Sequence, residues 1–389
     1  MNEMQLLKLI ANDIFNKGGI LYLVGGCVRD EILGKENKDI DVEVHNIPFE
    51  TLKEILNQYG EVDEVGSSFG VLIIKGYDID FAMPRNERKV SSGHKGFEIV
   101  VNPYIGTYEA SKRRDITINA LMKNILTGEI VDHFNGLTDA KNKTIHHIDD
   151  KTFVEDPLRV FRVAQFASRF KFNISEETLN LCKAIDVSTL SRERVFKELE
   201  KAILKSDKPS VFFKSLKEMD KLEPYFNDLN KLSEEKFSDL MKRIDSLEIK
   251  NVELVLSLMA FYTQTLETLL NPITNEKKLI KSVDINLKGL NLLNESLSDT
   301  LFRRISYVTL NQVDFNVLVR AVTDDSTFLI KQLETAKELV AKPLINSKDL
   351  LELGFKPGKE FGEMLKTSMD LQIEGLSKSE IIKKITSLI

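Results

Sequence analysis

The patterns that predict β-strands are confined to the first part of this 389-residue chain. Short apolar runs and alternating segments recur up to about residue 148. Beyond about residue 150, apolar residues repeat at helical spacing between short polar breaks. A chain of this length is also too long for one core. We therefore predict an α+β fold, in which a small head with a mixed sheet and helices precedes an all-helical remainder.

Composition and polar breaks refine this organisation. We predict a head over 1–148, a neck over 149–206, a body over 207–330 and a tail over 331–389. The hydrophobic content of 42% and charged content of 29% are ordinary for a globular protein, and no apolar run reaches membrane length. The two cysteines, Cys27 and Cys182, exclude a disulfide scaffold and fit a reducing cytoplasm.

The net charge and the first residues exclude two further classes. The net charge of −6 argues against a nonspecific nucleic-acid binder but leaves room for a local basic groove. The opening MNEMQLLKLIANDIF is patterned as an amphipathic helix rather than a signal peptide. Nothing in the pattern indicates a membrane segment or an obligatory protein partner.

A double glycine closes the first predicted strand. In LVGGCVRDEILG, Gly25 and Gly26 end a strand and open a helix that carries Arg29. Such a turn lets backbone N–H groups approach a phosphate, with the positive end of the helix behind them. Arg29, one turn in, would add a bidentate contact to the same triphosphate. The alternative is a tight turn with an arginine on the surface.

Two aspartates follow on the next strand. In DIDVEVH, alternation puts Asp39 and Asp41 on one face of the strand. Neighbouring carboxylates repel unless a cation lies between them, and oxygen ligands beside phosphates favour Mg²⁺. Asp80, in YDIDFAM, adds a third acid on a strand that can pair nearby, with Asp78 as its rival. Three acids beside a phosphate-binding turn indicate two-metal nucleotidyl transfer.

The order of five motifs is similar to that of one family, the class II tRNA nucleotidyltransferases and bacterial poly(A) polymerases. The motifs are GGCVRD with DID, KRRDITINAL, DHFNGLTDAKNKTIHHI, EDPLRVFRVAQF and SRERVFKELEK, and NSKDLLELGFKPGKEFGEML resembles the family's C-terminal segment. The resemblance implies a polymerase-β-like head, a helical neck, body and tail, Mg²⁺ as cofactor, CTP and ATP as substrates and tRNA as partner.

The second motif supplies charge and a carboxylate. Arg113 and Arg114 can bind triphosphate or ribose, and Asp115 can accept a hydrogen bond from a ribose hydroxyl. The resemblance implies that this motif, with Asn119, binds the nucleotide and selects ribonucleotides. The alternative is that Asp115 caps a helix over 116–124.

The fourth motif bears on the base. On a helix, Asp156 and Arg159 share a face that Arg162 extends, and the ordinary interpretation is a surface ion pair. A carboxylate accepting from an exocyclic amine and an arginine donating to a ring nitrogen would admit cytosine and adenine and reject uracil and guanine. The resemblance implies this role for Asp156 and Arg159. The fifth motif, a helix capped by Ser191 with Arg194 and Glu198 paired, would support the base-reading helix.

Three further features bear on the reaction. His146 and Gln165 stand where the family commonly has arginine, which weakens two nucleotide contacts. The polar stretch 85–102 is predicted to be a mobile loop, and its presence favours addition of the full CCA sequence. The sequence thus predicts a CCA-adding enzyme. The alternatives are an A-adding or CC-adding enzyme or a poly(A) polymerase, a small-molecule nucleotidyltransferase, or an RNA-binding protein without catalysis.

Overall fold

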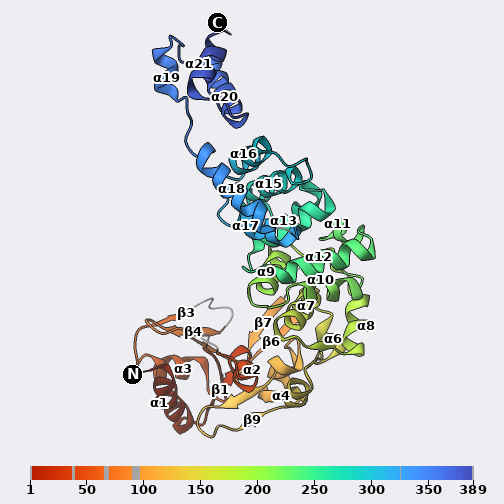
Figure 1. Cartoon of the computed structure of the whole chain (residues 1–389). Helices are drawn as coiled ribbons and strands as arrows, with labels where there is room; N and C mark the ends of the chain where they lie inside the picture. Colours follow the sequence, from red (N-terminus) through yellow and green to blue (C-terminus); the bar gives the residue numbers. More distant parts are fainter. Residues whose placement is uncertain (1, 37–39, 65–69, 90–96, 325, 388–389) are drawn as a thin grey trace. The chain divides into compact units, whose positions relative to one another are not determined.

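The computed structural model describes residues 2–36, 40–64, 70–89, 97–324 and 326–387. The contacts divide the chain into two compact units, Met1–Pro224 and Tyr225–Ile389 (Figure 1). The predicted head and neck therefore lie in one unit, and the predicted boundaries near 148, 206 and 330 stay predictions. No helix among the described residues is long and apolar enough to span a membrane.

A seven-stranded mixed sheet organises the first unit. Its order is β3-β4-β5-β2-β1-β8-β9, and the pairing of β2 with β5 is parallel while the other pairs are antiparallel. The strands are β1 (Ile20–Val24), β2 (Ile40–His45), β3 (Val62–Glu64), β4 (Val71–Ile74), β5 (Ile79–Ala82), β8 (Met122–Asn124) and β9 (Ile130–Val131).

Helices cover one face of this sheet. The apolar stripe of α1 (Glu3–Asn16) and that of α3 (Phe49–Leu56) pack against alternate strand residues such as Leu23, Val42 and Phe81. The predicted N-terminal helix is thus confirmed. On the opposite face of β2, the residues at the intervening positions are acidic or basic, as they are in DIDVEVH. The core consequently fixes which face carries the charged side chains.

The remaining elements of the first unit connect this sheet to a helical end. They are α2 (Gly26–Ile32), α4 (Gly106–Lys112), a 3₁₀ turn (Thr117–Asn119), α5 (Gly136–Asn142), α6 (Asp150–Phe153), α7 (Leu158–Phe170), α8 (Glu176–Ala184), α9 (Arg192–Leu204) and α10 (Ser210–Glu218), with short strands β10 (Thr144–Ile145) and β11 (Asn173–Ile174). Helix α7 packs against α9 and α10.

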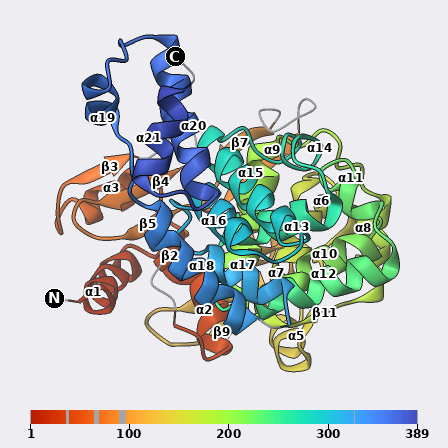
Figure 2. The ribbon, with the colours of Figure 1, turned by 45° about the horizontal axis from the view of Figure 1, so that its top comes forward.

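The second unit is helical throughout its described residues. Its helices are α11 (Asn227–Asn230), α12 (Glu234–Ser246), α13 (Val252–Thr263), α14 (Glu267–Leu270), α15 (Lys277–Leu292), α16 (Asp299–Val308), α17 (Phe315–Val322), α18 (Ser326–Val340), α19 (Ser347–Glu352), α20 (Lys359–Ile373) and α21 (Lys378–Thr386). Helices α13, α15, α16 and α18 pack in succession (Figure 2). The predicted α+β class is confirmed.

Two local predictions need correction. The stretch predicted as a mobile loop contains β6 (Arg85–Lys89) and β7 (Phe97–Val101), which pair as an antiparallel ribbon, while 90–96 lie outside the described residues. The β-branched run at the end of FEIVV explains the second strand. The predicted helix over 116–124 is only a 3₁₀ turn followed by β8, which extends the main sheet beside β1.

Replacing Phe81 by alanine tests which side of the sheet holds the core. The Phe81 side chain is fully buried in β5, next to Asp80, so Phe81→Ala should lower the free energy of unfolding by about 3–5 kcal/mol. The matched control is Phe15→Ala, because the Phe15 ring is 64% exposed on α1. Urea titration followed by circular dichroism measures both. Equal losses in the two variants would contradict this packing.

Candidate active site

Asp41 and Asp80 lie side by side on the charged face of the sheet. They are aligned in the register of the parallel strands β2 and β5, which places them one strand spacing apart, about 4.8 Å. Both side chains are exposed. Asp78 precedes β5, so the register brings Asp80 rather than Asp78 opposite Asp41. Asp39, the other predicted metal ligand, lies outside the described residues.

Arg114 lies against the glycine turn. Gly25 precedes α2 with φ +67°, a conformation that favours glycine, and Gly26 is the first residue of the helix. A Cβ atom on Gly25 would lie 2.9 Å from Nη1 of Arg114, closer than such atoms approach. The absence of a side chain at Gly25 thus lets this guanidinium lie on the turn, as a shared phosphate-binding role requires.

Glu43 anchors both arginines of the second motif. The residue is 1% exposed; Oε1 accepts a hydrogen bond from His45 at 2.9 Å, and Oε2 lies 3.2 Å from Arg113 and 3.8 Å from Arg114. Burial raises the pKa of this carboxyl, but the hydrogen bond from His45 and the charges of Arg114 and Arg113 outweigh it and lower the pKa to about 2. Sequence reasoning missed Glu43, although the alternation of DIDVEVH puts it on the face of Asp41.

Asp115 is the most heavily bonded carboxylate of the site. It accepts from Nε and Nη2 of Arg162, both at 2.7 Å, and from Asn119 and the backbone N–H of Ile116, both at 2.9 Å. These four donors match the roughly four acceptor positions of a carboxylate. Through Arg162, Asp115 therefore connects the second motif to α7. Its contact with the ribose stays a prediction.

Arg29, predicted to contact a triphosphate, lies among internal partners, and the triphosphate contact stays a prediction. Arg29 is 5% exposed and donates to Asp30 at 2.8 Å and to Asn119 Oδ1 at 2.6 Å. Its guanidinium also lies 4.8 Å from the ring centre of Phe170, and burial lowers its pKa. The arginine is thus committed to internal partners. Asn119 was also predicted to bind nucleotide. Its amide oxygen accepts a hydrogen bond from Arg29, and its amide nitrogen donates one to Asp115.

The prediction that Asp156 and Arg159 share one face of a helix is wrong. Pro157 precedes α7, which begins at Leu158, so Asp156 lies before the helix and accepts from the Leu158 N–H at 3.1 Å. Its carboxylate accepts from Nη2 of Arg194 at 2.9 and 3.1 Å. Asp156 and Arg159 therefore do not form the simple ion pair that helical spacing suggests.

Arg159 instead joins two backbone segments. It donates to the carbonyl oxygens of Thr152 and Arg113, each at 2.6 Å. The second carbonyl belongs to Arg113, whose guanidinium pairs with Glu43. One residue, Arg113, consequently contacts the sheet through its side chain and the base of α7 through its carbonyl.

The fifth motif supports the fourth through a contact between Arg194 and Asp156, which the sequence did not predict. Ser191 precedes α9 but makes no capping hydrogen bond with its side chain, and Arg194 reaches Asp156 rather than Glu198. Glu198 is buried and pairs with Lys201 at 2.8 Å. The predicted pair Arg194–Glu198 is therefore corrected, because Asp156 offers Arg194 a nearer carboxylate.

The two departures from the motif pattern have local partners. His146 pairs with Asp139 at 2.9 Å, and Asp139 also accepts from the Thr117 hydroxyl at 2.6 Å. Gln165 is 1% exposed within α7, and its Nε2 has no partner among the described residues. The Gln165 side chain therefore lies in the interior of the first unit rather than on an open surface.

Comparison with known proteins agrees with this geometry. Residues 21–146, which include most of β1 and all strands of the seven-stranded sheet that follow it, match the family described as poly A polymerase head domain. This part of the first unit is thus similar to a poly A polymerase head domain. The resemblance to class II tRNA nucleotidyltransferases and bacterial poly(A) polymerases is thus confirmed.

Two relatives named "Multifunctional CCA protein" are similar to about half of this chain. The chain is 38% identical to that of Haemophilus ducreyi over 219 residues, which are 54% of this chain and 52% of the relative. It is 40% identical to that of Pasteurella multocida over 217 residues, 54% of this chain and 50% of the relative. The chain therefore spans about half the length of these relatives.

Solved structures share the fold over nearly the whole chain. The Bacillus stearothermophilus CCA-adding enzyme in complex with CTP superposes with a TM-score of 0.75 at 20% identity, covering 100% of this chain and 98% of that one. The Thermotoga maritima CCA-adding enzyme complexed with tRNA gives 0.69 at 23% identity, covering 98% and 94%. At this identity the likeness establishes the fold, head domain and helical remainder together.

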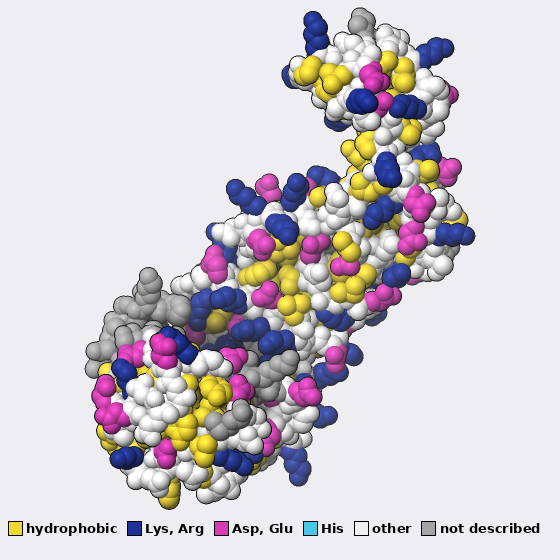
Figure 3. All heavy atoms as spheres, turned by 90° about the vertical axis from the view of Figure 1, so that its left-hand side faces the viewer, with side chains coloured by type: hydrophobic (Ala, Val, Ile, Leu, Met, Phe, Trp, Pro, Cys, Tyr) yellow, Lys and Arg dark blue, Asp and Glu magenta, His cyan; other side chains and the backbone are white. Residues whose placement is uncertain are grey.

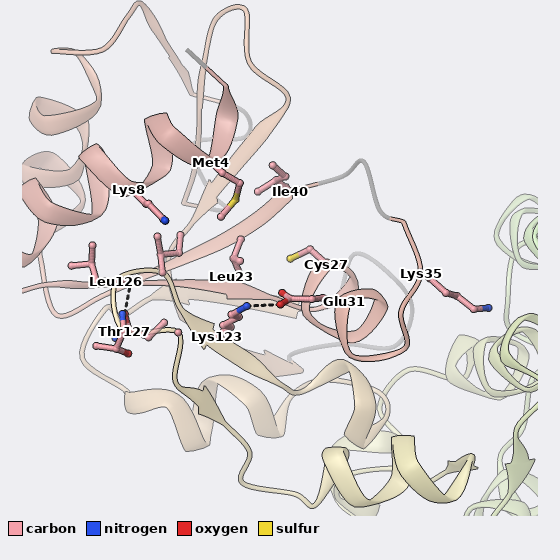
Figure 4. A pocket seen from close by; sticks show the side chains of 13 residues that line it. Met4, Lys8, Leu23, Cys27, Glu31, Lys35, Ile40, Lys123, Leu126 and Thr127 are labelled. Carbon is pink, nitrogen blue, oxygen red and sulfur yellow. Dashed lines mark hydrogen bonds and ion pairs between the residues drawn. The ribbon is translucent and has the colours of Figure 1, made fainter.

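The head domain also contains a cavity of about 650 Å³ (Figure 4). Its lining includes Leu23, Ile40 and the half-buried thiol of Cys27. Leu23 and Ile40 point to the sheet face opposite Asp41, because neighbouring residues of a strand alternate between faces. This cavity is therefore separate from the carboxylates of the candidate site.

The carboxylates of the head domain suit a hard cation. Asp41 and Asp80 offer exposed oxygen ligands on adjacent strands, the donor type that Mg²⁺ prefers. Among the described residues, no group of three His, Cys, Asp or Glu side chains is placed to hold a metal ion, and Asp39 is not among them. The two aspartates therefore fit as part of a metal site.

The charge network of Asp115 predicts an acid-dependent loss of stability. Burial raises its pKa, but the charge and hydrogen bonds of Arg162, with the hydrogen bond from Asn119, lower it to about 2. The folded pKa is thus below the unfolded value, so the stabilisation is present above about pH 4 and is lost as the pH falls toward 2. The linked stabilisation is about 2 kcal/mol.

Asp115→Asn should remove that dependence. Urea unfolding at a series of pH values from neutral to acidic should show a shallower decline for the variant than for the wild-type chain. Asp186→Asn is the control, because Asp186 is an exposed carboxylate bonded mainly to the adjacent Ser188. Parallel curves for wild type and Asp115→Asn would show that Asp115 does not provide this stabilisation.

Proposed function

We propose that the chain adds C and A nucleotides to the 3′ end of tRNA without a nucleic-acid template, using CTP and ATP. The observation that carries the proposal is the alignment of Asp41 with Asp80, on a head domain whose glycine turn lies against Arg114. The names of the relatives support it, since they are called multifunctional CCA proteins, and the solved structures of similar fold are CCA-adding enzymes.

The glycine turn and the second motif would hold the triphosphate. Backbone N–H groups of Gly25 and Gly26 can approach phosphate oxygens, and Arg114 lies on the same turn. Arg113 adds a second guanidinium, and the Arg113 side chain is 25% exposed. Both guanidiniums lie near the carboxylate of Glu43, and both stay partly exposed, where a phosphate can approach them.

Asp39 and Asp41 would hold Mg²⁺, with Asp80 as the third carboxylate. When bound, the metal lowers the pKa of the attacking hydroxyl and offsets the charge on the departing pyrophosphate. The carboxylates orient the two reacting groups on the open face of the sheet. The 3′ oxygen of the RNA bonds to the α-phosphorus, the bond from that phosphorus to the bridging oxygen breaks, pyrophosphate leaves and the hydroxyl proton passes to water.

Asp156 and Arg159 would read the base, with Arg162 extending this region. The carboxylate accepts from the exocyclic amine of cytosine or adenine and the guanidinium donates to the ring nitrogen. In the structure these groups are bonded to Arg194 and to backbone carbonyls. Base reading therefore requires Asp156 and Arg159 to exchange at least some of these partners when the nucleotide binds. Until then, Arg194 holds the carboxylate of Asp156 in place.

The helical remainder would bind the body of the tRNA through its phosphates. Lys and Arg side chains stand out from the surface among acidic ones (Figure 3). Lys356 and Lys359 are exposed at the start of α20, where phosphate contacts are favourable. We infer a cytoplasmic site of action, since tRNA is the substrate and the two cysteines are free thiols.

Incorporation of labelled nucleotides tests the activity. With Mg²⁺, transcripts of tRNA ending before CCA, after C and after CC should all be extended to CCA, without incorporation of U or G. Asp41→Ala should reduce the rate by about a thousandfold or more, because several kcal/mol of transition-state stabilisation are lost, while tRNA binding is retained. Asp78→Ala is the control and should stay near the wild-type rate.

Other outcomes separate the alternatives. Extension of only the CC-ended transcript would make the chain an A-adding enzyme, and arrest after CC a CC-adding enzyme. A long run of A would make it a poly(A) polymerase. Continued incorporation by Asp41→Ala would refute the assignment of the metal ligand.

The base-reading pair makes a separate prediction about fidelity. Asp156→Asn keeps the shape of the side chain but replaces one acceptor oxygen with a donor, so preference for CTP over UTP should fall. A lost base contact of about 1–3 kcal/mol corresponds to a decrease of about 5- to 150-fold in the ratio of kcat/KM values. Asp150→Asn, at an exposed carboxylate of α6, is the control. An unchanged ratio would exclude Asp156 from base reading.

A further inference from the structure

We propose that Glu43 is a positioning residue for triphosphate binding, which holds Arg113 and Arg114 in place without touching the nucleotide itself. The inference rests on the proposed nucleotidyl transfer at this site. Its basis is a buried carboxylate that lies beneath two partly exposed arginines and one glycine turn.

The strand fixes where Glu43 points. Glu43 lies between Val42 and Val44, whose side chains are fully buried in the core on the other face of β2. Alternation therefore directs Glu43 to the face that carries Asp41. At 1% exposure, it is held inside that face while Asp41 stays exposed.

The two oxygens of Glu43 have separate partners. Oε1 accepts from Nε2 of His45 at 2.9 Å, and the His45 ring packs edge-on against Tyr22 at 5.3 Å between ring centres. Oε2 faces Arg113 at 3.2 Å and Arg114 at 3.8 Å. His45 thus fixes the rotation of the carboxylate, and the oxygen that remains is directed at both guanidiniums.

The exposure of the partners shows which groups remain accessible to a ligand. The side chains of Arg113 and Arg114 are 25% and 19% exposed, whereas that of Glu43 is 2% exposed. The carboxylate can therefore act on a triphosphate only through the arginines. A buried anchor that restricts two partly exposed guanidiniums suits an anionic ligand, because less freedom of the arginines is lost when the ligand binds.

Arg114 carries this restraint to the glycine turn. Its Nη1 lies 2.9 Å from the position that a Cβ atom of Gly25 would take, so the guanidinium lies close to the turn. A small displacement of Arg114 would open the space over the turn. Misplacing a binding group by about 1 Å can cost about 100-fold in rate. The anchor of Arg114 is therefore as important as its charge.

Arg113 extends the restraint toward the base-reading segment. Its carbonyl accepts from Arg159 at 2.6 Å while its side chain reaches Glu43. The position of residue 113 thus depends on the sheet at one end and on α7 at the other. Loosening Glu43 should weaken triphosphate binding first, with the base-reading contact affected only through the backbone.

Glu43→Gln tests the proposal, because it keeps the shape of the side chain and removes its charge. The Kd for CTP and for inorganic tripolyphosphate, measured by calorimetry, should rise about 10- to 100-fold, while the Kd for CMP changes little. In the incorporation assay KM for CTP should rise more than kcat falls. Asp228→Asn is the matched control, since Asp228 is also a buried carboxylate, bonded to Lys231, Thr265 and Thr268 in the second unit.

A double-mutant cycle separates positioning from general loosening. If Glu43 acts through Arg114, the effects of Glu43→Gln and Arg114→Ala on tripolyphosphate binding should be less than additive. Should Glu43→Gln fail to fold, His45→Gln serves instead, because it removes the partner that orients the carboxylate and should weaken tripolyphosphate binding in the same direction.

Two results would overturn the inference. One is tripolyphosphate binding by Glu43→Gln as tight as that of the wild-type chain, and the other is an equal loss of affinity for CMP and CTP. Failure of the wild-type chain itself to bind CTP or tripolyphosphate would instead count against the proposed function. The wild-type measurement therefore distinguishes the two failures.

Discussion

The first unit depends on the bidentate ion pair between Asp115 and Arg162. A buried carboxylate is costly unless its charge is paired and its oxygens accept hydrogen bonds, and the donors around Asp115 meet both conditions. The pair also joins two distant parts of the sequence, the second motif of the head and helix α7.

The network continues from Asp115 without interruption. Asn119 links Asp115 to Arg29, Arg29 pairs with Asp30, and Asp30 also accepts from Arg169 at 3.1 Å near the end of α7. Helix α7 is thus fixed to the head at two points along its length. These polar contacts between α7 and the head agree with the division of the chain, which places the predicted head and neck in one unit.

The sequence predicted the parts of the site that follow from local periodicity. Alternation in DIDVEVH put Asp41 on the charged face, and the glycines marked the turn before α2. The choice between Asp78 and Asp80 depended on the register of β2 against β5, which is a pairing of segments far apart in sequence. The internal partner of Arg29 could not be predicted for the same reason, since Asn119 lies 90 residues away.

Glu43 was overlooked because a charged residue in a strand is usually exposed, and only distant partners reverse that expectation. His45 lies in the same strand, but the arginines that make burial tolerable come from a motif about 70 residues later. The predicted helical pair of Asp156 and Arg159 failed for a different reason. Helix α7 begins at Leu158, after Pro157, so Asp156 lies outside the helix and pairs with Arg194 of α9. In both cases arginines decide the geometry. A carboxylate in this fold is therefore best interpreted by asking which guanidinium it holds, because that pairing settles whether it faces a ligand or the interior.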